Sequence, residues 1–205
     1  NRKTGFSNTL SNKPFVVVAM TLSLYAAWFV LPFLLNRPDA ATLEAPLVGL
    51  DKVLGMFSEE LIVTLVLVVF LSAIGWWRKT GFQRIEKGGL KFLVPPILFA
   101  LVLHQVLTLM APEDHGLFGF ISAQQFFIAV VTVLLLGFNE EMVFRGITYY
   151  GFSTRVHPIQ AVIIAAVIFG LFHYVNMLGE GQSFVPTTYQ VLHAMAAGFM
   201  YGALR

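Results

Sequence analysis

Two short polar motifs stand inside long apolar stretches of this 205-residue chain. The first is Glu140-Glu141 followed by Arg145, and the second is Phe169 followed four residues later by His173. An ionised side chain at the middle of a bilayer costs about 2.5–3.5 kcal/mol even on a lenient insertion scale. These charged side chains are therefore expected to face the interior of a helix bundle or a watery cavity, where they can take part in acid–base chemistry.

The spacing of the first motif separates its two carboxylates. Glu141 and Arg145 are four residues apart, so on a helix they share one face, as an ion pair would. Glu140 is rotated by about 100° from Glu141 and points elsewhere. We therefore expect Glu141 to be tied to Arg145 and Glu140 to be available as a base.

The turn expected from Ser153 to Pro158 sets the depth of both motifs. Glu140 lies thirteen residues before Ser153, and His173 lies fifteen residues after Pro158. At about 1.5 Å per residue these distances are roughly 20 and 22 Å, so two antiparallel helices bring the carboxylate and the imidazole to one level. Such a pair is suited to activating water. Phe169 and Asn176 share the helix face of His173.

The composition identifies a membrane protein. The chain is 57% hydrophobic and 12% charged, with a mean hydropathy of +0.76, whereas soluble domains have about 45–50% apolar and about 25% charged residues. These values exclude a soluble enzyme, an extended nucleic-acid binder and a disordered tail. The absence of cysteine excludes a disulfide framework, a thiolate metal site and a cysteine nucleophile.

Six apolar segments are long enough to predict an all-α, polytopic transmembrane helix bundle of about six helices, because only helices and closed barrels satisfy the backbone in lipid. One conflict remains: a helix from Leu117 that carries Glu140 at mid-depth would be too long to cross once, so residues 117–127 are an alternative interfacial or re-entrant piece. We expect one membrane domain over 1–205, with N-terminal helices in 1–133 and a motif-bearing core in 134–205. The six segments are Pro14–Leu35, Leu61–Trp77, Phe92–Ala111, Leu117–Phe138, Pro158–Leu178 and about Tyr189–Leu204.

The basic residues predict the orientation. Cytoplasmic loops of membrane proteins carry an excess of Lys and Arg, which indicates a cytoplasmic N-terminus in an integral membrane protein, most simply of a bacterial plasma (inner) membrane. Membrane lipid is an expected partner and nucleic acid is not, because topology alone explains the basic segment 78–91. The outer set is only Arg37 and Lys52, and the inner set is Arg2, Lys3, Lys13, Arg78, Lys79, Arg84, Lys87, Lys91, Arg155 and Arg205.

The two motifs together resemble those of the CPBP family of intramembrane proteases, which includes CAAX prenyl endopeptidases and bacteriocin-processing or immunity (Abi-type) proteins. The family pattern Glu-Glu-x-x-x-Arg is matched by residues 140–145 and followed by the common Gly146, and Phe-x-x-x-His is matched by residues 169–173. The resemblance covers about Leu134 to Arg205. It implies that Glu140 is the general base, that His173 is its partner and that Glu141 and Arg145 support the site.

The resemblance also implies an activity: hydrolysis of a peptide bond in a membrane-tethered polypeptide, either a CAAX-type prenylated protein or a precursor. Phe169, Asn176 and His193 are candidate residues for the substrate, for the oxyanion or for support. The closing family motif, His-x-x-x-Asn or His-x-x-x-Asp, is not matched, since His193 is followed by Ala197. We expect one or two further helices beyond Arg205 to carry it.

Two other classes of function stay open. A catalytically silent relative could act as a scaffold or regulator of a partner membrane protein, which the unmatched closing motif favours. A proton-coupled transporter could use Glu140 and His173 as a proton relay, although the sequence shows no repeat or pair of broken helices. The structural alternatives are an ion pair that ties helices together, for Glu141 and Arg145, and a core histidine, for His173.

The mechanism could be metal-dependent or glutamate-dependent. No His-Glu-x-x-His motif for zinc is present, but Glu140, His173 and His193 could supply three ligands. Zinc is therefore possible, no cofactor is firmly implied, and we favour a site without a tightly held metal.

Overall fold

The structure is a computed structural model that describes residues 9–36, 50–82, 94, 98, 123–179 and 182–203. Every regular element in these ranges is a helix, which confirms the all-α prediction. The chain divides into two compact units. The second comprises Pro46–Ile62 and Gln83–Leu136, and the first, which holds both motifs, comprises Asn1–Ala45, Val63–Phe82 and Gly137–Arg205.

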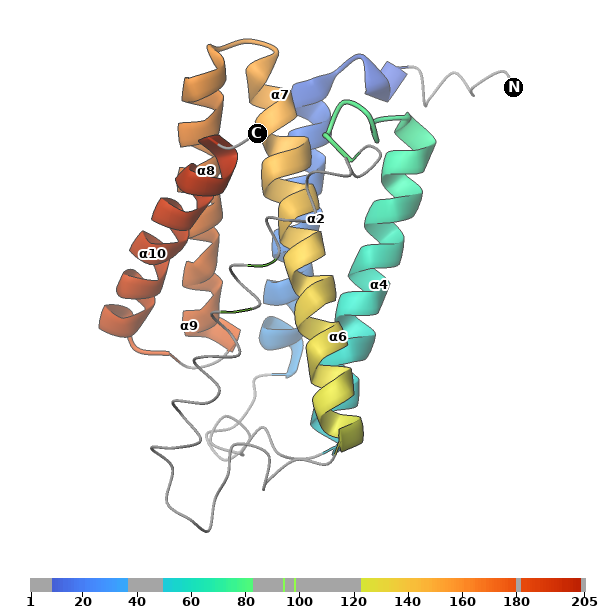
Figure 1. Cartoon of the computed structure of the whole chain (residues 1–205), viewed down its shortest axis with the longest axis vertical. Helices are drawn as coiled ribbons and strands as arrows, with labels where there is room; N and C mark the ends of the chain where they lie inside the picture. The colour runs from blue at the N-terminus through green and yellow to red at the C-terminus, as the bar shows by residue number, and fades with distance from the viewer. Residues whose placement is uncertain are drawn as a thin grey trace. The chain divides into compact units, whose positions relative to one another are not determined.

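Among the described residues, four helical stretches are long and apolar enough to cross a membrane, as expected of a polytopic membrane protein. Helix α2 (Pro14–Asn36) and helix α4 (Leu50–Ile74) provide the first two (Figure 1). The Trp-Trp pair predicted to end the second span follows α4 instead of lying inside it. The predicted span Phe92–Ala111 lies outside the described residues except for Val94 and Leu98, both helical. The four stretches are Pro14–Leu31, Val53–Ile74, Phe127–Ser153 and Pro158–Leu178.

The third span differs from its prediction. Helix α6 (Ala123–Glu140) continues directly into η2 (Glu141–Thr148) and α7 (Tyr149–Ser153), so the expected end at Phe138 is wrong. Hydropathy placed the end too early because the charged motif lowers the local average. The span Phe127–Ser153 puts Glu140 near its middle, which agrees with the depth inferred from the turn.

Element η2 is a π-helix that contains the first motif from Glu141 onward, and its residues from Met142 to Thr148 are all buried. π-helical turns are rare, occur mostly as short insertions in α-helices and are frequent at functional sites. The π-helical geometry therefore points to the same segment as a functional site that its charged residues indicated in the sequence.

Helix α8 (Pro158–Phe172) begins with a well-formed cap. Pro158 occupies the first helical turn, where its missing N–H costs nothing. The His157 ring accepts a hydrogen bond from the Ile159 backbone N–H, and the Gln160 side chain accepts one from the His157 backbone N–H. The helix then tightens at η3 (His173–Val175) and continues as α9 (Asn176–Gly179).

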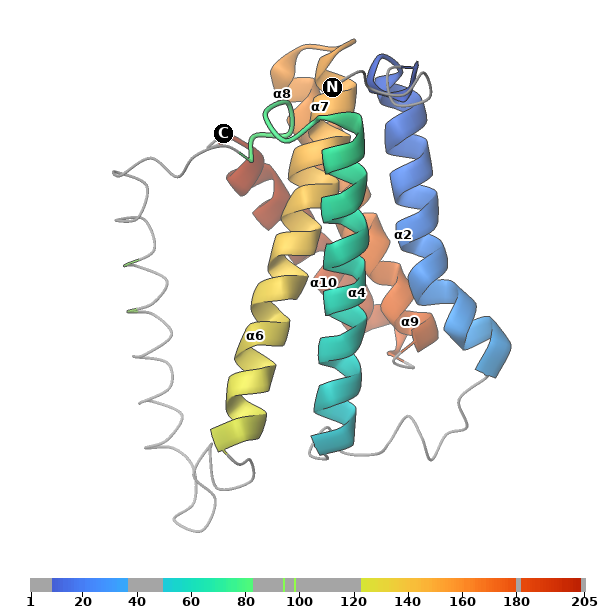
Figure 2. The same cartoon turned by 90° about the vertical axis from the view of Figure 1, so that its right-hand side faces the viewer.

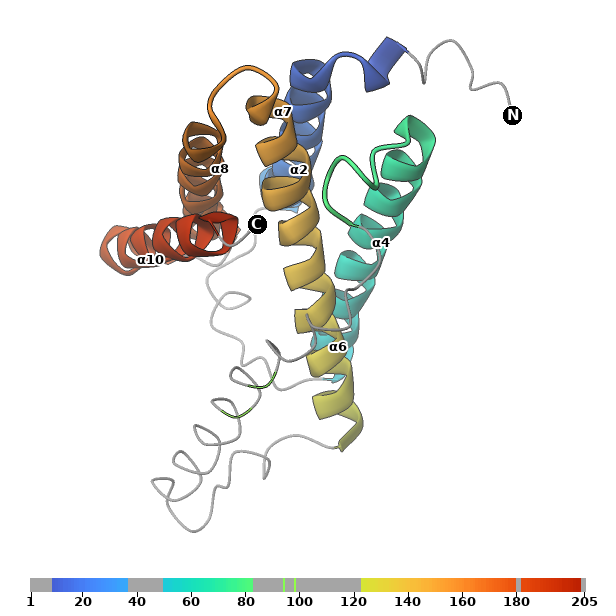
Figure 3. The same cartoon turned by 45° about the horizontal axis from the view of Figure 1, so that its top comes forward.

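Helix α10 (Phe184–Ala203) packs across α8, as Figure 3 shows. It begins five residues before the predicted Tyr189 and is not among the spans found in the described chain. Small residues line the contact: a Cβ at Gly198 would lie 3.2 Å from the Ala166 Cβ, and one at Gly170 would lie 2.7 Å from the Val191 carbonyl oxygen. The absence of these side chains lets the two helices approach closely.

This packing predicts that Gly170→Ala destabilises the protein. The new methyl group would overlap the Met195 side chain and press on the α10 backbone, and such overpacking costs about 1–3 kcal/mol. Thermal unfolding in detergent, followed by circular dichroism, should show a lower midpoint. The control is Gly137→Ala in α6, where a Cβ meets nothing within 4 Å and the better helix propensity of alanine should leave the midpoint unchanged or higher. Equal midpoints for the two variants would contradict the close α8–α10 packing.

Candidate active site

An aromatic cluster sets the register of the motif-bearing helices. The Phe144 ring of η2 lies 5.0 Å from the Phe169 ring and 5.5 Å from the Phe172 ring of α8, measured between centroids. From α2, the Tyr25 ring contacts Phe144 at 5.8 Å and Phe172 at 5.1 Å. Such ring pairs contribute about 0.5–1.5 kcal/mol each beyond the area they bury. Together these contacts hold η2 against α8, with Tyr25 of α2 packed on both Phe144 and Phe172.

This register puts the two motifs at one depth. Glu140 is one helical turn before Phe144, and His173 is one helical turn after Phe169. Because η2 and α8 run antiparallel from the turn at residues 154–157, both steps lead in the same direction. Glu140 and His173 therefore lie at similar depth, as the residue spacing had indicated.

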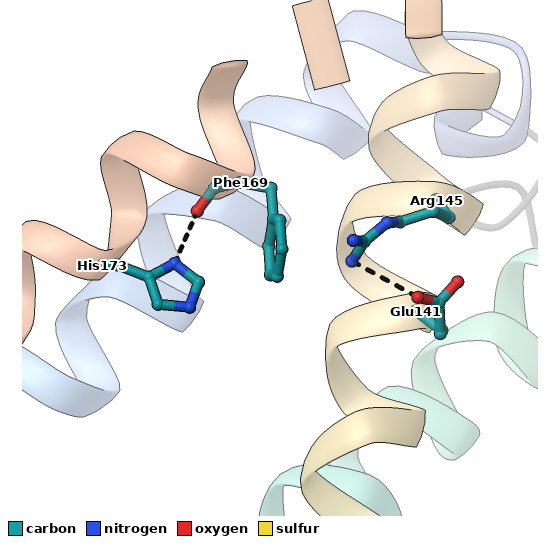
Figure 4. A network of polar contacts seen from close by, with 4 residues as sticks. All are labelled: Glu141, Arg145, Phe169 and His173. Carbon is teal, nitrogen blue, oxygen red and sulfur yellow. Dashed lines mark hydrogen bonds and ion pairs between the residues drawn. The ribbon is translucent and has the colours of Figure 1, made fainter. Parts of the chain in front are cut away.

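Four side chains form a continuous row between the helices (Figure 4). Arg145 Nη1 lies 3.3 Å from Glu141 Oε1, which confirms the predicted ion pair. The Arg145 guanidinium carbon lies 3.9 Å from the centroid of the Phe169 ring. On its other side, that ring meets the His173 imidazole edge-to-face at 4.8 Å and 89°. Phe169 thus separates the cation from the imidazole.

The row compensates the charge of Arg145. The arginine side chain is only 9% exposed, whereas its partner Glu141 is 47% exposed. A buried cation needs a counter-charge or an equivalent interaction. Glu141 provides the first, and the face of the Phe169 ring provides the second, worth about 2 kcal/mol when desolvated. Arg145 Nε makes no hydrogen bond to the described chain, so the guanidinium retains a spare donor.

The backbone controls the protonation pattern of His173. Its Nδ1 lies 2.9 Å from the carbonyl oxygen of Phe169. A carbonyl oxygen only accepts, so Nδ1 carries the hydrogen and Nε2 of the neutral ring is left as an acceptor. His173 is half-buried at the point where α8 tightens into η3. An imidazole held in this tautomer can accept a hydrogen bond from water.

The first motif has a support that sequence reasoning missed. Asn139 is fully buried, and its Oδ1 accepts a hydrogen bond of 2.8 Å from the Thr64 hydroxyl of α4. The bond fixes the residue directly before Glu140, which is itself half-buried and engaged in a polar or electrostatic interaction. A buried amide beside the motif was the available signal, since such groups hydrogen-bond between membrane helices.

Two of the predicted supporting residues lie away from the row. Asn176 Nδ2 donates to Gln190 Oε1 at 3.1 Å and so ties α9 to α10. His193 lies on α10 and is exposed, while Val191 and Ala194 of the same helix are buried. Helix spacing alone placed Asn176 on the face of His173 but could not show which partner it would meet.

The metal-ligand set considered from the sequence is not assembled. In the part of the chain that the structure describes, no three His, Cys, Asp or Glu side chains are placed to hold a metal ion. Glu140 at the end of α6, His173 at the start of η3 and His193 on α10 are thus not grouped as a three-ligand site among the described residues.

Comparison with known families agrees with the motifs. Residues 122–205 match the model of the Rce1-like family, described as type II CAAX prenyl endopeptidase Rce1-like. This segment is similar to that family. The match covers α6 to α10 and both motifs, and it confirms the resemblance to the CPBP proteases. No curated protein and no solved structure matches the chain. The four long apolar helices indicate an integral membrane protein.

The ion pair predicts a loss of stability in Glu141→Gln. The change would leave the buried Arg145 guanidinium without its counter-charge, and an unsatisfied buried group costs about 1–3 kcal/mol. The midpoint of thermal unfolding in detergent should therefore fall. The matched control is Glu59→Gln, at an exposed carboxylate of α4, where the free energy of unfolding should stay within about 0.5 kcal/mol of wild type and the midpoint should barely move. A midpoint for Glu141→Gln equal to that of the control would show that the pair contributes nothing.

Proposed function

We propose that this protein is an intramembrane endopeptidase that hydrolyses a peptide bond in a membrane-tethered, CAAX-type polypeptide, with Glu140 and His173 activating the water. The observation that carries the proposal is the hydrogen bond from His173 Nδ1 to the Phe169 carbonyl. It leaves Nε2 as an acceptor at the depth of Glu140, inside a segment that is similar to a family of prenyl endopeptidases.

The proposed chemistry is general base catalysis. A water molecule held by Glu140 and His173 Nε2 gives a proton to the Glu140 carboxylate as its oxygen attacks the scissile carbonyl carbon. The C–O bond forms, and the carbonyl π electrons move to the oxygen. When this intermediate collapses, the C–N bond breaks and the Glu140 proton passes to the leaving amine. The reaction consumes one water, and Glu140 returns to its carboxylate form.

The other members of the row are proposed to position these groups. The Phe169 carbonyl sets the tautomer of His173, and the Phe169 ring keeps the Arg145 charge away from the imidazole. The Glu141–Arg145 pair anchors the π-helix on which the motif stands.

The substrate class follows from the location of the site. Glu140 lies near the middle of an apolar span, so a polypeptide already held in the membrane reaches it more readily than a soluble one. We propose a prenylated C-terminus or a membrane-bound precursor as substrate. We also propose a cytoplasmic N-terminus and a location in a bacterial plasma membrane, on the basis of the basic residues on one side of the chain.

The proposal predicts that Glu140→Gln abolishes cleavage without unfolding the protein, because an amide cannot accept the proton of water. The rate on farnesylated and unprenylated precursor peptides should fall by at least about 100-fold, within the range attributed to general base catalysis. The full-length protein in detergent is assayed by mass spectrometry of the products, with Glu59→Gln as the control and with and without a chelator. The glutamate mechanism requires that the chelator has no effect.

Three outcomes would change the proposal. Cleavage retained in Glu140→Gln would remove the base role from this residue. Chelator-sensitive cleavage would point to a metal held by a different set of ligands. Folded wild-type protein that cleaves none of the peptides would favour a catalytically silent scaffold for a partner membrane protein.

A further inference from the structure

One end of the first unit gathers four exposed cations from three separate parts of the chain. Lys13 lies directly before α2, Arg78 and Lys79 follow α4, and Arg155 follows α7. Figures 1 and 2 both show the start of α2, the segment after α4 and the turn after α7 at the same end. We call these four residues the basic end.

The segment after α4 is held firmly in place. The Trp76 side chain is completely buried, and its Nε1 donates to the Ser11 carbonyl oxygen at 3.2 Å. Its ring also meets the Tyr150 ring of α7 at 4.8 Å. The turns on either side use positive φ angles, 70° at Gly75 and 85° at Gly81, which glycine adopts without strain. Arg78 and Lys79 are therefore displayed from a fixed loop.

Two of the four cations are positioned by aromatic rings. Lys79 Nζ lies 5.6 Å from the centroid of Trp76 and 5.8 Å from that of Tyr150. The guanidinium carbon of Arg155 lies 5.9 Å from the Phe15 ring. These distances are within the cation–π range of about 6 Å. Membrane topology requires positive charge on one side, but it does not require that the charges be held in this way.

No carboxylate neutralises the basic end from its own segments. The stretches 9–18, 74–82 and 147–160, which form this end, contain no Asp or Glu. Four exposed cations without a local counter-ion attract anions at the membrane surface, where each Lys or Arg contributes about a fivefold gain in affinity for an anionic leaflet.

An apolar depression begins beside Arg155. It is lined by Val156, which precedes α8, and by Gln160, Ile163 and Ile164 in the first half of that helix. Ile163 is exposed. An exposed cation therefore lies next to an apolar depression on a membrane helix. An amphiphile with an anionic headgroup and an apolar chain would complement both features.

We infer that the basic end binds the phosphate headgroup of an anionic phospholipid, with an acyl chain along the depression on α8. The lipid would also bear on the candidate active site, because a Cβ at Gly146 of η2 would lie 3.2 Å from Thr80 and from Phe82 of the same fixed loop. A headgroup that stabilises this loop would thereby also stabilise the π-helix η2, which packs against the loop at Gly146. This inference does not depend on the peptidase activity.

Quenching of tryptophan by brominated lipids tests the inference. The Trp28→Phe protein keeps Trp76 and Trp77, both at the basic end, as reporters. It is reconstituted in phosphatidylcholine vesicles that contain brominated phosphatidylglycerol or, at equal mole fraction, brominated phosphatidylcholine. The anionic lipid should bind about fivefold or more tightly, and combining Arg78→Gln, Lys79→Gln and Arg155→Gln should remove this preference. As a control, Lys52→Gln alone in the Trp28→Phe protein, at the other end of α4, should leave the preference for the anionic lipid unchanged.

Equal quenching by the two lipids, or a preference that survives in the triple variant, would overturn the inference. Loss of the preference on adding inorganic phosphate at constant ionic strength would also overturn it, in favour of a free-anion site. If the triple variant fails to fold by circular dichroism, the single Arg78→Gln and Arg155→Gln variants replace it, and each should lower the preference. Peptidase assays on the same vesicles separate this result from the proposed function.

Discussion

The need to hold a cation in an apolar environment governs the construction of the motif-bearing unit. Arg145 is almost completely buried within a membrane span, where lipid chains provide neither a counter-charge nor a hydrogen-bond acceptor. Its compensation comes from two directions, the Glu141 carboxylate on its own helix and the Phe169 ring on α8. Because one of these partners belongs to another helix, η2 and α8 can separate only at the cost of exposing the charge to hydrocarbon.

The packing around this row keeps the two helices in one register. Tyr25 of α2 closes the aromatic cluster on one side, and the Thr64–Asn139 hydrogen bond fixes the residue before Glu140 from α4. On the far side of α8, glycines let α10 approach to van der Waals distance. Each contact limits the sliding of a helix that carries a motif residue. Non-covalent packing alone therefore keeps the His173 imidazole and the Glu140 and Glu141 carboxylates at the same depth.

The π-helix gives the first motif a particular character. Seven of its eight residues are buried, and only Glu141 at its beginning reaches half exposure. A wider helix of this kind turns successive side chains by less than an α-helix does, so it changes which residues share a face. The sequence pattern does not predict the π-helix, because the residue types in 141–148 are also compatible with an ordinary α-helix. The pair Glu141–Arg145 tolerates it because a spacing of four keeps the two side chains close in both geometries.

Residue spacing along single helices explains which features could be predicted. The Glu141–Arg145 pair and the common depth of Glu140 and His173 depend on helix geometry and one turn, which local sequence specifies. The end of the third span was misplaced, since hydropathy counts the motif charges as if lipid faced them. The role of the buried Asn139 was not predicted because its hydrogen-bond partner, Thr64, is 75 residues away in the sequence.

The sequence by itself determined that this is a helical membrane protein, where its charges interrupt the apolar spans, and that its C-terminal part carries two protease-like motifs. These properties depend on composition and on contacts within four residues. Only the tertiary structure decided that Phe169 stands between Arg145 and His173, that Asn176 turns to Gln190 and that His193 stays exposed. A side chain on a helix can meet several neighbours, and the choice among them follows from helix crossings, which depend on packing of residues far apart in the chain.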